Sequence, residues 1–113
     1  MATYSTAALV KSRIKKYNTT ITDAEIEDYI LHAEGLINAI MQGKFTASFD
    51  ATKHKLIQRA TTNLAAFNLL CYDPGSFTSI TEASIIGDFL FTMIEQDLKF
   101  LADDRIVSYI NGL

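Results

Sequence analysis

Histidine and cysteine are the first side chains to examine for chemistry, because they are common metal ligands and nucleophiles. The chain has two histidines, His32 and His54, and one cysteine. His32 stands two residues before Glu34, but no HExxH motif, cysteine pair or histidine–carboxylate cluster supplies three zinc ligands. We therefore expect no metal site and no cofactor.

Cys71 has no sequence neighbours that would activate a thiolate, and it falls on an apolar stripe with helical spacing. We expect it to behave as a small, buried hydrophobic residue. A single cysteine cannot form an internal disulfide, which favours a reducing compartment.

Acidic residues do not form a recognisable catalytic pair. Glu25, Glu27 and Asp28 crowd one predicted helix start, where capping and solubility explain them. The sequence also lacks the GxGxxG, GxxxxGK and GxSxG motifs of nucleotide-binding and hydrolytic sites. We expect no catalytic residue and no enzymatic activity. Further acidic residues are expected at the surface or at an interface: Glu34, Asp88 and Asp97.

The basic residues form two weak clusters in a chain of net charge −3, with ten basic and thirteen acidic residues. Proteins that bind the phosphate backbone of a nucleic acid usually carry a net positive charge. The clusters are either solvated helix faces or contacts with a nucleic acid or an acidic partner. The first consists of Lys11, Arg13, Lys15 and Lys16, and the second of Lys53, Lys55 and Arg59.

The elements that carry these residues are predicted to be helices around one hairpin, Leu56 to Leu101. Both halves place apolar residues at steps of three and four, and the turn 73–76 between them contains the only proline, Pro74. Gly87 inside the second half indicates a close helix crossing. We expect Leu64 and Phe89 in the core, where substitution by alanine costs about 2–5 kcal/mol.

Local signals place the other helices. We expect a first helix over 6–16, capped by Ser5 or Thr6, and a second that starts at a Thr22–Glu25 capping box and stops at Gly43. The aromatic residues of the loop between Gly43 and Asp50 should pack against the core. Asp50 is expected to cap a helix over 51–71, and Ser79–Glu82 is a second capping box, for a helix over 80–102. The aromatic residues of the loop are Phe45 and Phe49.

These elements predict a single all-α domain over 1–113, a small bundle of four, or up to five, helices around the central hairpin. It divides into an N-terminal arm over 1–5, a helical bundle over 6–102 and an extended C-terminal tail over 103–113. The tail is rich in β-branched and aromatic residues, so it either folds back onto the bundle or joins a neighbouring chain as a strand. Its candidate interface residues are Arg105, Ile106, Val107, Tyr109, Ile110 and Leu113.

Apolar residues exceed what a small bundle needs. They make up 49% of the chain, and in the helix over 80–102 they cover more than one face. This surplus predicts burial against another subunit. No apolar run approaches the ~18 residues of a membrane span, so we expect no membrane partner.

The layout resembles the head–tail connector proteins, or head-completion adaptors, of long-tailed phages and prophages. Three segments carry the resemblance over about Tyr4 to Asp104. They are Val10-Lys11-Ser12-Arg13-Ile14 after an opening Tyr4-Ser5, the capped Thr22-Asp23-Ala24-Glu25-Ile26 helix, and Arg59-Ala60-Thr61 through Leu64-Ala65-Ala66 to Leu70-Cys71-Tyr72-Asp73.

The resemblance implies a virion protein that is assembled in the host cytoplasm and lies at the head–tail junction. Such proteins form a ring, typically dodecameric, beneath the portal protein. The ring extends the DNA channel without sequence-specific binding and docks a stopper or tail-completion protein. The family has no catalytic motif, and its terminal segments commonly contact the portal or neighbouring subunits.

An alternative is a small helical DNA-binding or regulatory protein. It would need a recognition helix that presents bases and amides on one face. The helix over 51–71, with Lys53, Arg59 and Asn63, is the candidate. Asparagine is a poor helix former, so Asn63 and Asn68 either are exposed or make polar contacts at an interface.

Overall fold

A computed structural model describes residues 3–14, 21–72 and 80–113, and within these residues it contains five helices and no strand. The predicted all-α bundle is therefore confirmed. The predicted turn at 73–76 lies outside the described residues. The helices are α1 (Ala7–Arg13), α2 (Asp23–Met41), α3 (Lys55–Tyr72), α4 (Ile80–Leu101) and α5 (Asp104–Asn111).

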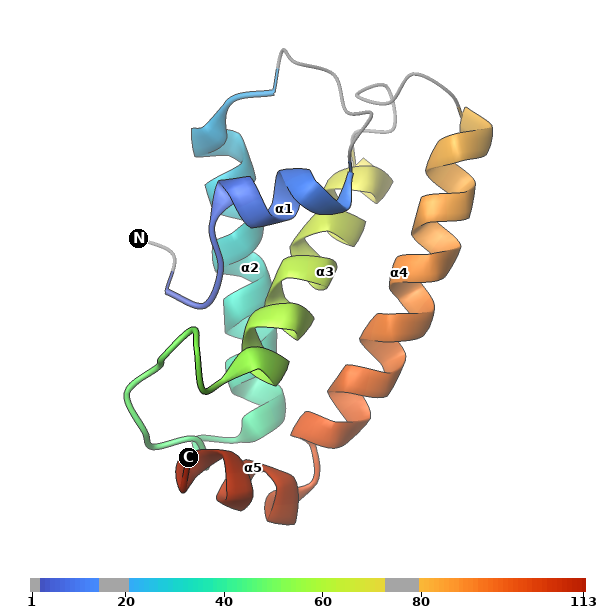
Figure 1. The fold of residues 1–113 in the computed structure, drawn as a ribbon. Coiled ribbons are helices and arrows are strands. Elements are labelled where there is room, and N and C mark those ends of the chain that lie inside the picture. Colours follow the sequence, from blue (N-terminus) through green and yellow to red (C-terminus); the bar gives the residue numbers. More distant parts are fainter. Residues whose placement is uncertain (1–2, 15–20, 73–79) are drawn as a thin grey trace.

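Helix α3 is the centre of the bundle. It packs against α1, α2 and α4, and every residue from Ala60 to Ala66 is buried. The three long helices lie side by side, α1 crosses α2 and α3 on one side, and α5 lies across the far end (Figure 1). Small residues such as Ala60, Ala65 and Ala66 suit a helix that has neighbours on three sides, because they allow close approach.

The predicted starts of α1 and α2 are confirmed. The Thr6 hydroxyl accepts from the Leu9 N–H at 3.3 Å, and the Thr22 hydroxyl accepts from the Glu25 N–H at 3.2 Å. Helix α2 ends where predicted, because Gln42 and then Gly43 adopt left-handed conformations, with φ of 54° and 73°. Helix α1 ends at Arg13, three residues earlier than predicted.

Helix α3 begins at Lys55 rather than at residue 51. The Asp50 carboxylate caps a short turn instead of the helix, since it accepts from the Thr52 N–H at 2.7 Å and the Lys53 N–H at 3.3 Å. The Asp50 N–H in turn donates to Nδ1 of the buried His54 at 2.9 Å. These local bonds satisfy the backbone and delay the start of the helix.

The C-terminal segment was predicted to be an extended tail that either folds back onto the bundle or joins a neighbouring chain as a strand. The fold-back alternative is confirmed, but the extended conformation is wrong. The segment folds back onto the bundle as α5, which Asp103 caps by accepting from the Arg105 N–H at 2.9 Å. Asp103 and Asp104 directly follow α4, where acidic residues would oppose the helix dipole, but they lie at the start of α5, where negative charge is stabilising. Val107 and Ile110, three residues apart, are buried on one face, and this burial outweighs their β propensity.

The loop between α2 and α3 packs as predicted, with two aromatic residues against the core. Phe45 and Phe49 lie beside His54, with ring centroids 5.1 Å and 5.9 Å away, and both contact Tyr4. The predicted close crossing at Gly87 is also confirmed, because a Cβ there would lie 2.8 Å from Leu70 Cδ2.

The predicted core register is half right. Leu64 is buried, but Phe89 is 65% exposed. Helix α4 has apolar residues on several faces, so periodicity alone does not identify the inner one. The face that packs inward contains Leu90, Ile94 and Leu101.

Candidate binding surfaces

A groove between α1 and α3 gathers positive charge. It has a volume of about 430 Å³, and none of the described residues that line it carries a carboxylate. Residues from both basic clusters meet here because α1 crosses α3. We call this the cationic groove, and its lining residues are Leu9, Arg13, Lys55, Leu56, Gln58, Arg59 and Thr62.

The three cations of the groove differ in how they are held. Arg59 pairs with the fully buried carboxylate of Asp97 on α4, whose hydrogen bond raises the pKa of Arg59. The Arg13 Nε donates to the neutral Asn63 Oδ1 at 3.0 Å. Lys55 is exposed and makes no ion pair with any described residue. The surplus charge therefore resides on Arg13 and Lys55.

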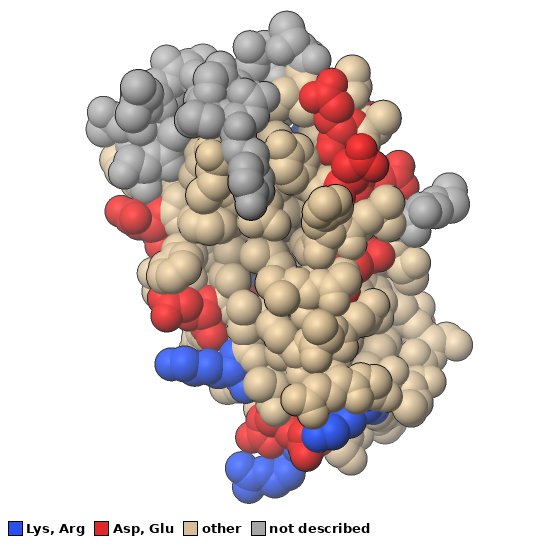
Figure 2. Space-filling model, turned by 180° about the vertical axis from the view of Figure 1, so that it is seen from behind, with Lys and Arg blue, Asp and Glu red and all other residues tan. Residues whose placement is uncertain are grey.

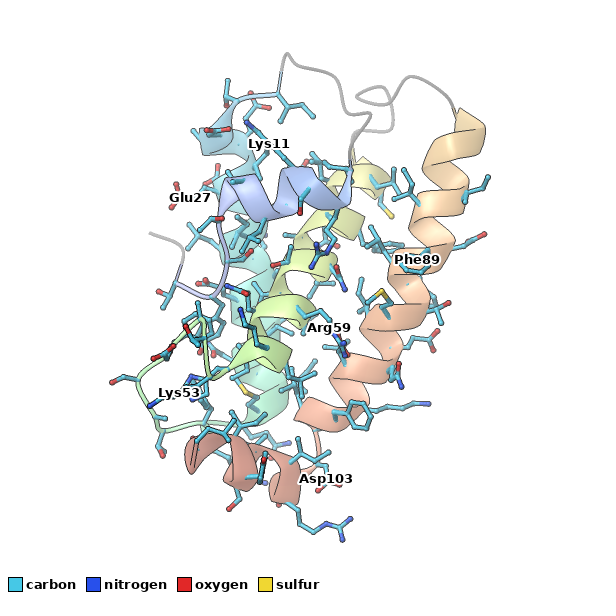
Figure 3. The ribbon with its side chains drawn as sticks, viewed as in Figure 1. Lys11, Glu27, Lys53, Arg59, Phe89 and Asp103 are labelled. Atoms are coloured by element: carbon cyan, nitrogen blue, oxygen red, sulfur yellow. The ribbon has the colours of Figure 1, made fainter. Side chains whose placement is uncertain are left out.

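An apolar stripe runs along α4 beside this groove. Ile85, Phe89 and Phe100 are 65%, 65% and 40% exposed, and Met93 between them is half-buried. The spacing of four, four and seven residues places all four on one side of the helix. The Met93 sulfur lies 4.0 Å from Nδ2 of Asn63, and the Oδ1 of Asn63 accepts from Arg13 of the groove. Figure 3 shows Arg59 reaching from α3 toward α4, with Phe89 on α4. We call these four residues the α4 stripe.

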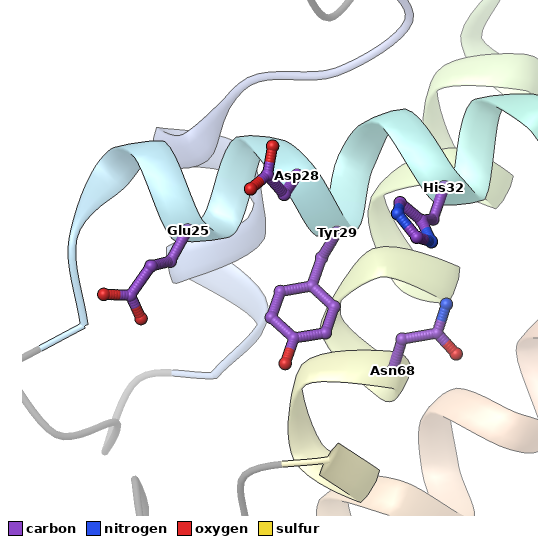
Figure 4. A pocket seen from close by; sticks show the side chains of 5 residues that line it. All are labelled: Glu25, Asp28, Tyr29, His32 and Asn68. Carbon is purple, nitrogen blue, oxygen red and sulfur yellow. The ribbon is translucent and has the colours of Figure 1, made fainter.

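A second pocket, of about 500 Å³, opens between α2 and α3. Five described residues line it, Glu25, Asp28, Tyr29 and His32 from α2 and Asn68 from α3, and none of these five is Lys or Arg. Figure 4 shows the tyrosine ring and the asparagine amide between the two helices, with both carboxylates on α2. We call this the acidic pocket.

The side of the molecule seen from behind is largely uncharged. Figure 2 shows a broad region free of charged side chains, with carboxylates along both edges and basic groups toward the lower end. Outside the α4 stripe, Leu36 on α2 and Phe91 on α4 are 45% and 49% exposed, and the Phe91 ring centroid lies 5.7 Å from that of Phe67 on α3.

Several polar residues lie deeper than predicted. Asp97 and Asn63 are fully buried, and Glu34 is 9% exposed. The Glu34 Oε1 accepts from the N–H groups of Thr3 and Tyr4, so it anchors the N-terminal arm. These contacts lie within the chain. The sequence did not reveal these contacts, because each one joins residues at least 30 positions apart.

Cys71 and Asp88 are both exposed. The prediction of a buried Cys71 is therefore wrong, because its side of α3 faces outward at the end of the bundle. Asp88 lies at the surface as predicted. Among the first basic cluster, Lys11 forms an ion pair with Asp23 at 2.5 Å, while Lys15 and Lys16 lie outside the described residues.

The C-terminal candidates split into two sets. Val107 and Ile110 are buried in the core, and Ile106 is half-buried against it. Tyr109, Leu113 and Arg105 are exposed, the first by 70%. A partner could therefore reach only this second set while α5 stays packed.

The two histidines lie in different parts of the molecule. His32 is exposed in the acidic pocket, and His54 is buried beside the loop aromatics. Within the described part of the chain, no three His, Cys, Asp or Glu side chains come together in a way that could hold a metal ion. No described helix has the length and apolar character needed to cross a membrane.

Comparison of the chain with protein-family models, curated proteins and solved structures finds no match.

Proposed function

We propose that the protein is a structural subunit of the head–tail connector of a tailed phage or prophage. In this role it forms a ring under the portal protein, extends the DNA channel and docks the stopper or tail. The sequence resemblance to connector proteins supplies the class, and the exposed apolar surface supports an assembling subunit.

The α4 stripe is the observation that carries this proposal. Of the eight large apolar residues exposed in the described part of the chain, three belong to this stripe, and a fourth, Phe91, lies on another side of α4. An interface of standard size covers about 800 Å² on each partner, roughly one-eighth of this chain's 6510 Å². Contiguous exposed apolar residues on such a small chain are typical of a surface that another subunit covers.

The geometry favours this function over the DNA-binding alternative. A recognition helix must present its polar side chains to base edges in a groove. Asn63, one of the three candidate residues, is fully buried, and the Arg59 guanidinium is held by Asp97. Lys53 lies in the turn before α3 rather than on the helix.

The test is the mass of the full-length protein in solution, alone and with a tailed-phage portal protein, by native mass spectrometry. We expect a complex with several copies of the chain in at least one condition. Phe89→Ser should weaken that complex, whereas Leu31→Ser, at an apolar residue on α2 that is 37% exposed, should not. A wild-type chain that stays monomeric in both conditions would contradict the proposal.

A further inference from the structure

We infer that copies of this chain join front to rear, with the cationic groove of one copy binding the acidic pocket of the next. The inference rests on the proposed self-assembly and adds which surfaces meet. The observation behind it is that the chain carries two hollows whose described lining residues have opposite charge. The groove contains Arg13, Lys55 and Arg59, and the pocket contains Glu25 and Asp28.

The two hollows lie on opposite sides of the molecule. Arg59 lines the groove and Asn68 lines the pocket, and both belong to α3. They are nine residues apart, which at 3.6 residues per turn is two and a half turns. Their side chains therefore leave α3 in opposite directions, so one copy cannot place its own pocket against its own groove.

A contact between two different surfaces is heterologous, and heterologous contacts generate rings when the rotation closes. A two-fold dimer formed through one of these surfaces would instead bring groove to groove or pocket to pocket. Each of these pairings places like charges together, which disfavours it. The charge distribution thus selects head-to-tail assembly over a two-fold dimer.

The charges that would pair are available in the folded chain. Arg13 makes its described hydrogen bonds to neutral oxygens of Asn63 and Ser12, and Lys55 makes no described ion pair. Glu25 and Asp28 are exposed, and neither forms an ion pair with a described cation. Arginine suits this contact, because its guanidinium can bind a carboxylate through two hydrogen bonds.

Apolar residues accompany both charged surfaces. Leu9 and Leu56 line the groove, and the α4 stripe lies beside it. On the other side, Tyr29 lines the pocket, and Leu36 follows one face of α2 two turns further on. Apolar contacts supply most of the affinity in such interfaces, and charge pairs fix the partner and its register.

Charge reversal tests the inference in the full-length protein, under the condition in which the wild type assembles. Arg13→Glu/Lys55→Glu makes the groove acidic, and Glu25→Lys/Asp28→Lys makes the pocket basic. Each double variant alone should weaken assembly about tenfold or more, because both of its mating surfaces then carry one sign. Mixed in equal amounts, they should assemble again, with the two variants alternating.

Two further variants separate this result from a change in folding or net charge. Asp88→Lys/Glu95→Lys makes the same charge change as the pocket variant at exposed acidic residues on α4, and it should assemble like the wild type. Glu25→Gln/Asp28→Asn removes the charges without reversing them and should weaken assembly by a smaller factor. Far-UV circular dichroism checks that each variant keeps its helices.

Three outcomes would overturn the inference. If the wild type assembles and both reversed variants assemble equally well, the charges do not form the contact and only the front-to-rear inference fails. If the reversed variants self-assemble but lose portal binding, the groove or pocket binds the portal instead. If the two variants fail to assemble when mixed, although the neutral variant assembles and both reversed variants fold, the surfaces do not face each other.

Discussion

The carboxylate of Asp97 on α4 lies fully buried, and the Arg59 guanidinium on α3 donates two hydrogen bonds to it, from Nε at 3.0 Å and from a terminal nitrogen. This pair joins the two helices of the central hairpin across their interface. It also holds the guanidinium at the edge of the cationic groove. The same two residues therefore serve the fold and the candidate binding surface.

Removing Arg59 should destabilise the protein strongly. Arg59→Leu leaves the Asp97 carboxylate buried without a counter-charge, and we expect a loss of about 3 kcal/mol in the free energy of unfolding. This loss is at the lower end of the range for breaking a buried ion pair, because the Arg59 side chain is 44% exposed. Urea denaturation measures it. Arg59→Leu/Asp97→Leu should recover most of the loss, and a double variant no more stable than the single one would contradict this account.

Two helix-interior glycines should respond oppositely to alanine. A Cβ added at Gly35 in α2 would meet no neighbouring atom within 4 Å, so Gly35→Ala should stabilise the protein by about 1 kcal/mol through helix propensity. At Gly87 the added Cβ would lie 2.8 Å from Leu70 Cδ2. Overpacking costs about 1–3 kcal/mol, so Gly87→Ala should be neutral or destabilising. Thermal unfolding of both variants measures these changes in stability. Equal stabilisation at the two positions would show that α3 and α4 pack less closely at Gly87 than described.

Sequence patterns predicted the helices well where a signal was local. The Thr22 cap and the stop at Gly43 each depend on residues within a few positions of each other. The same reasoning failed for the segment after Asp103, where β-branched residues suggested an extended tail. Its helix depends on burial of Val107 and Ile110 against distant residues, which local propensity does not contain.

The candidate surfaces were only partly predictable. Both basic clusters were visible in the sequence, but their meeting in one groove follows from the crossing of α1 over α3. The surplus of apolar residues on α4 was also visible. Which of them are exposed could not be read from the sequence, since Phe89 and Leu90 are adjacent and equally apolar. The packing of α4 against the other helices decides that Leu90 is the buried one.

Low pH should destabilise α5, because it protonates the N-cap residue Asp103. The Arg105 N–H, and secondly the Arg105 side chain, lower the pKa of Asp103 below its ordinary value. A carboxylate with a lower pKa in the folded state stabilises the fold above the unfolded pKa of about 4, and this contribution is lost as pH falls through the folded pKa. We expect amide exchange in α5 to speed up as pH falls below about 4, after correction for intrinsic rates.

Asp103→Asn is the matched control for this pH dependence. The asparagine oxygen can still accept from the Arg105 N–H, but the side chain does not titrate. Its α5 amides should therefore lack the pH-dependent step that the wild type shows. An identical pH profile in the two proteins would assign the effect to another carboxylate, such as Asp50, whose pKa is lowered chiefly by the Thr52 N–H.

Asn111 should hold α5 to the loop between α2 and α3. Its amide donates to the Lys44 carbonyl at 2.6 Å and accepts from the Thr46 and Ala47 N–H groups at 2.9 Å and 3.3 Å. Asn111→Ala removes all three bonds, and we expect a loss of about 1–2 kcal/mol and faster proteolysis of the loop. Asn111→Asp keeps the acceptor and should lose less. Equal losses would mean that the Lys44 bond dominates.

Adjacent substitutions on α4 should separate stability from assembly. Leu90 is 1% exposed, so Leu90→Ala leaves a cavity and should cost about 2–5 kcal/mol in the free energy of unfolding. Phe89 is 65% exposed, so Phe89→Ala should change the stability of the isolated chain by less than about 0.5 kcal/mol. If the α4 stripe contacts another subunit, Phe89→Ala should still reduce the mass of the complex. A large stability loss at Phe89 in the monomer would mean that its ring packs inward, and the stripe would then lose its central residue.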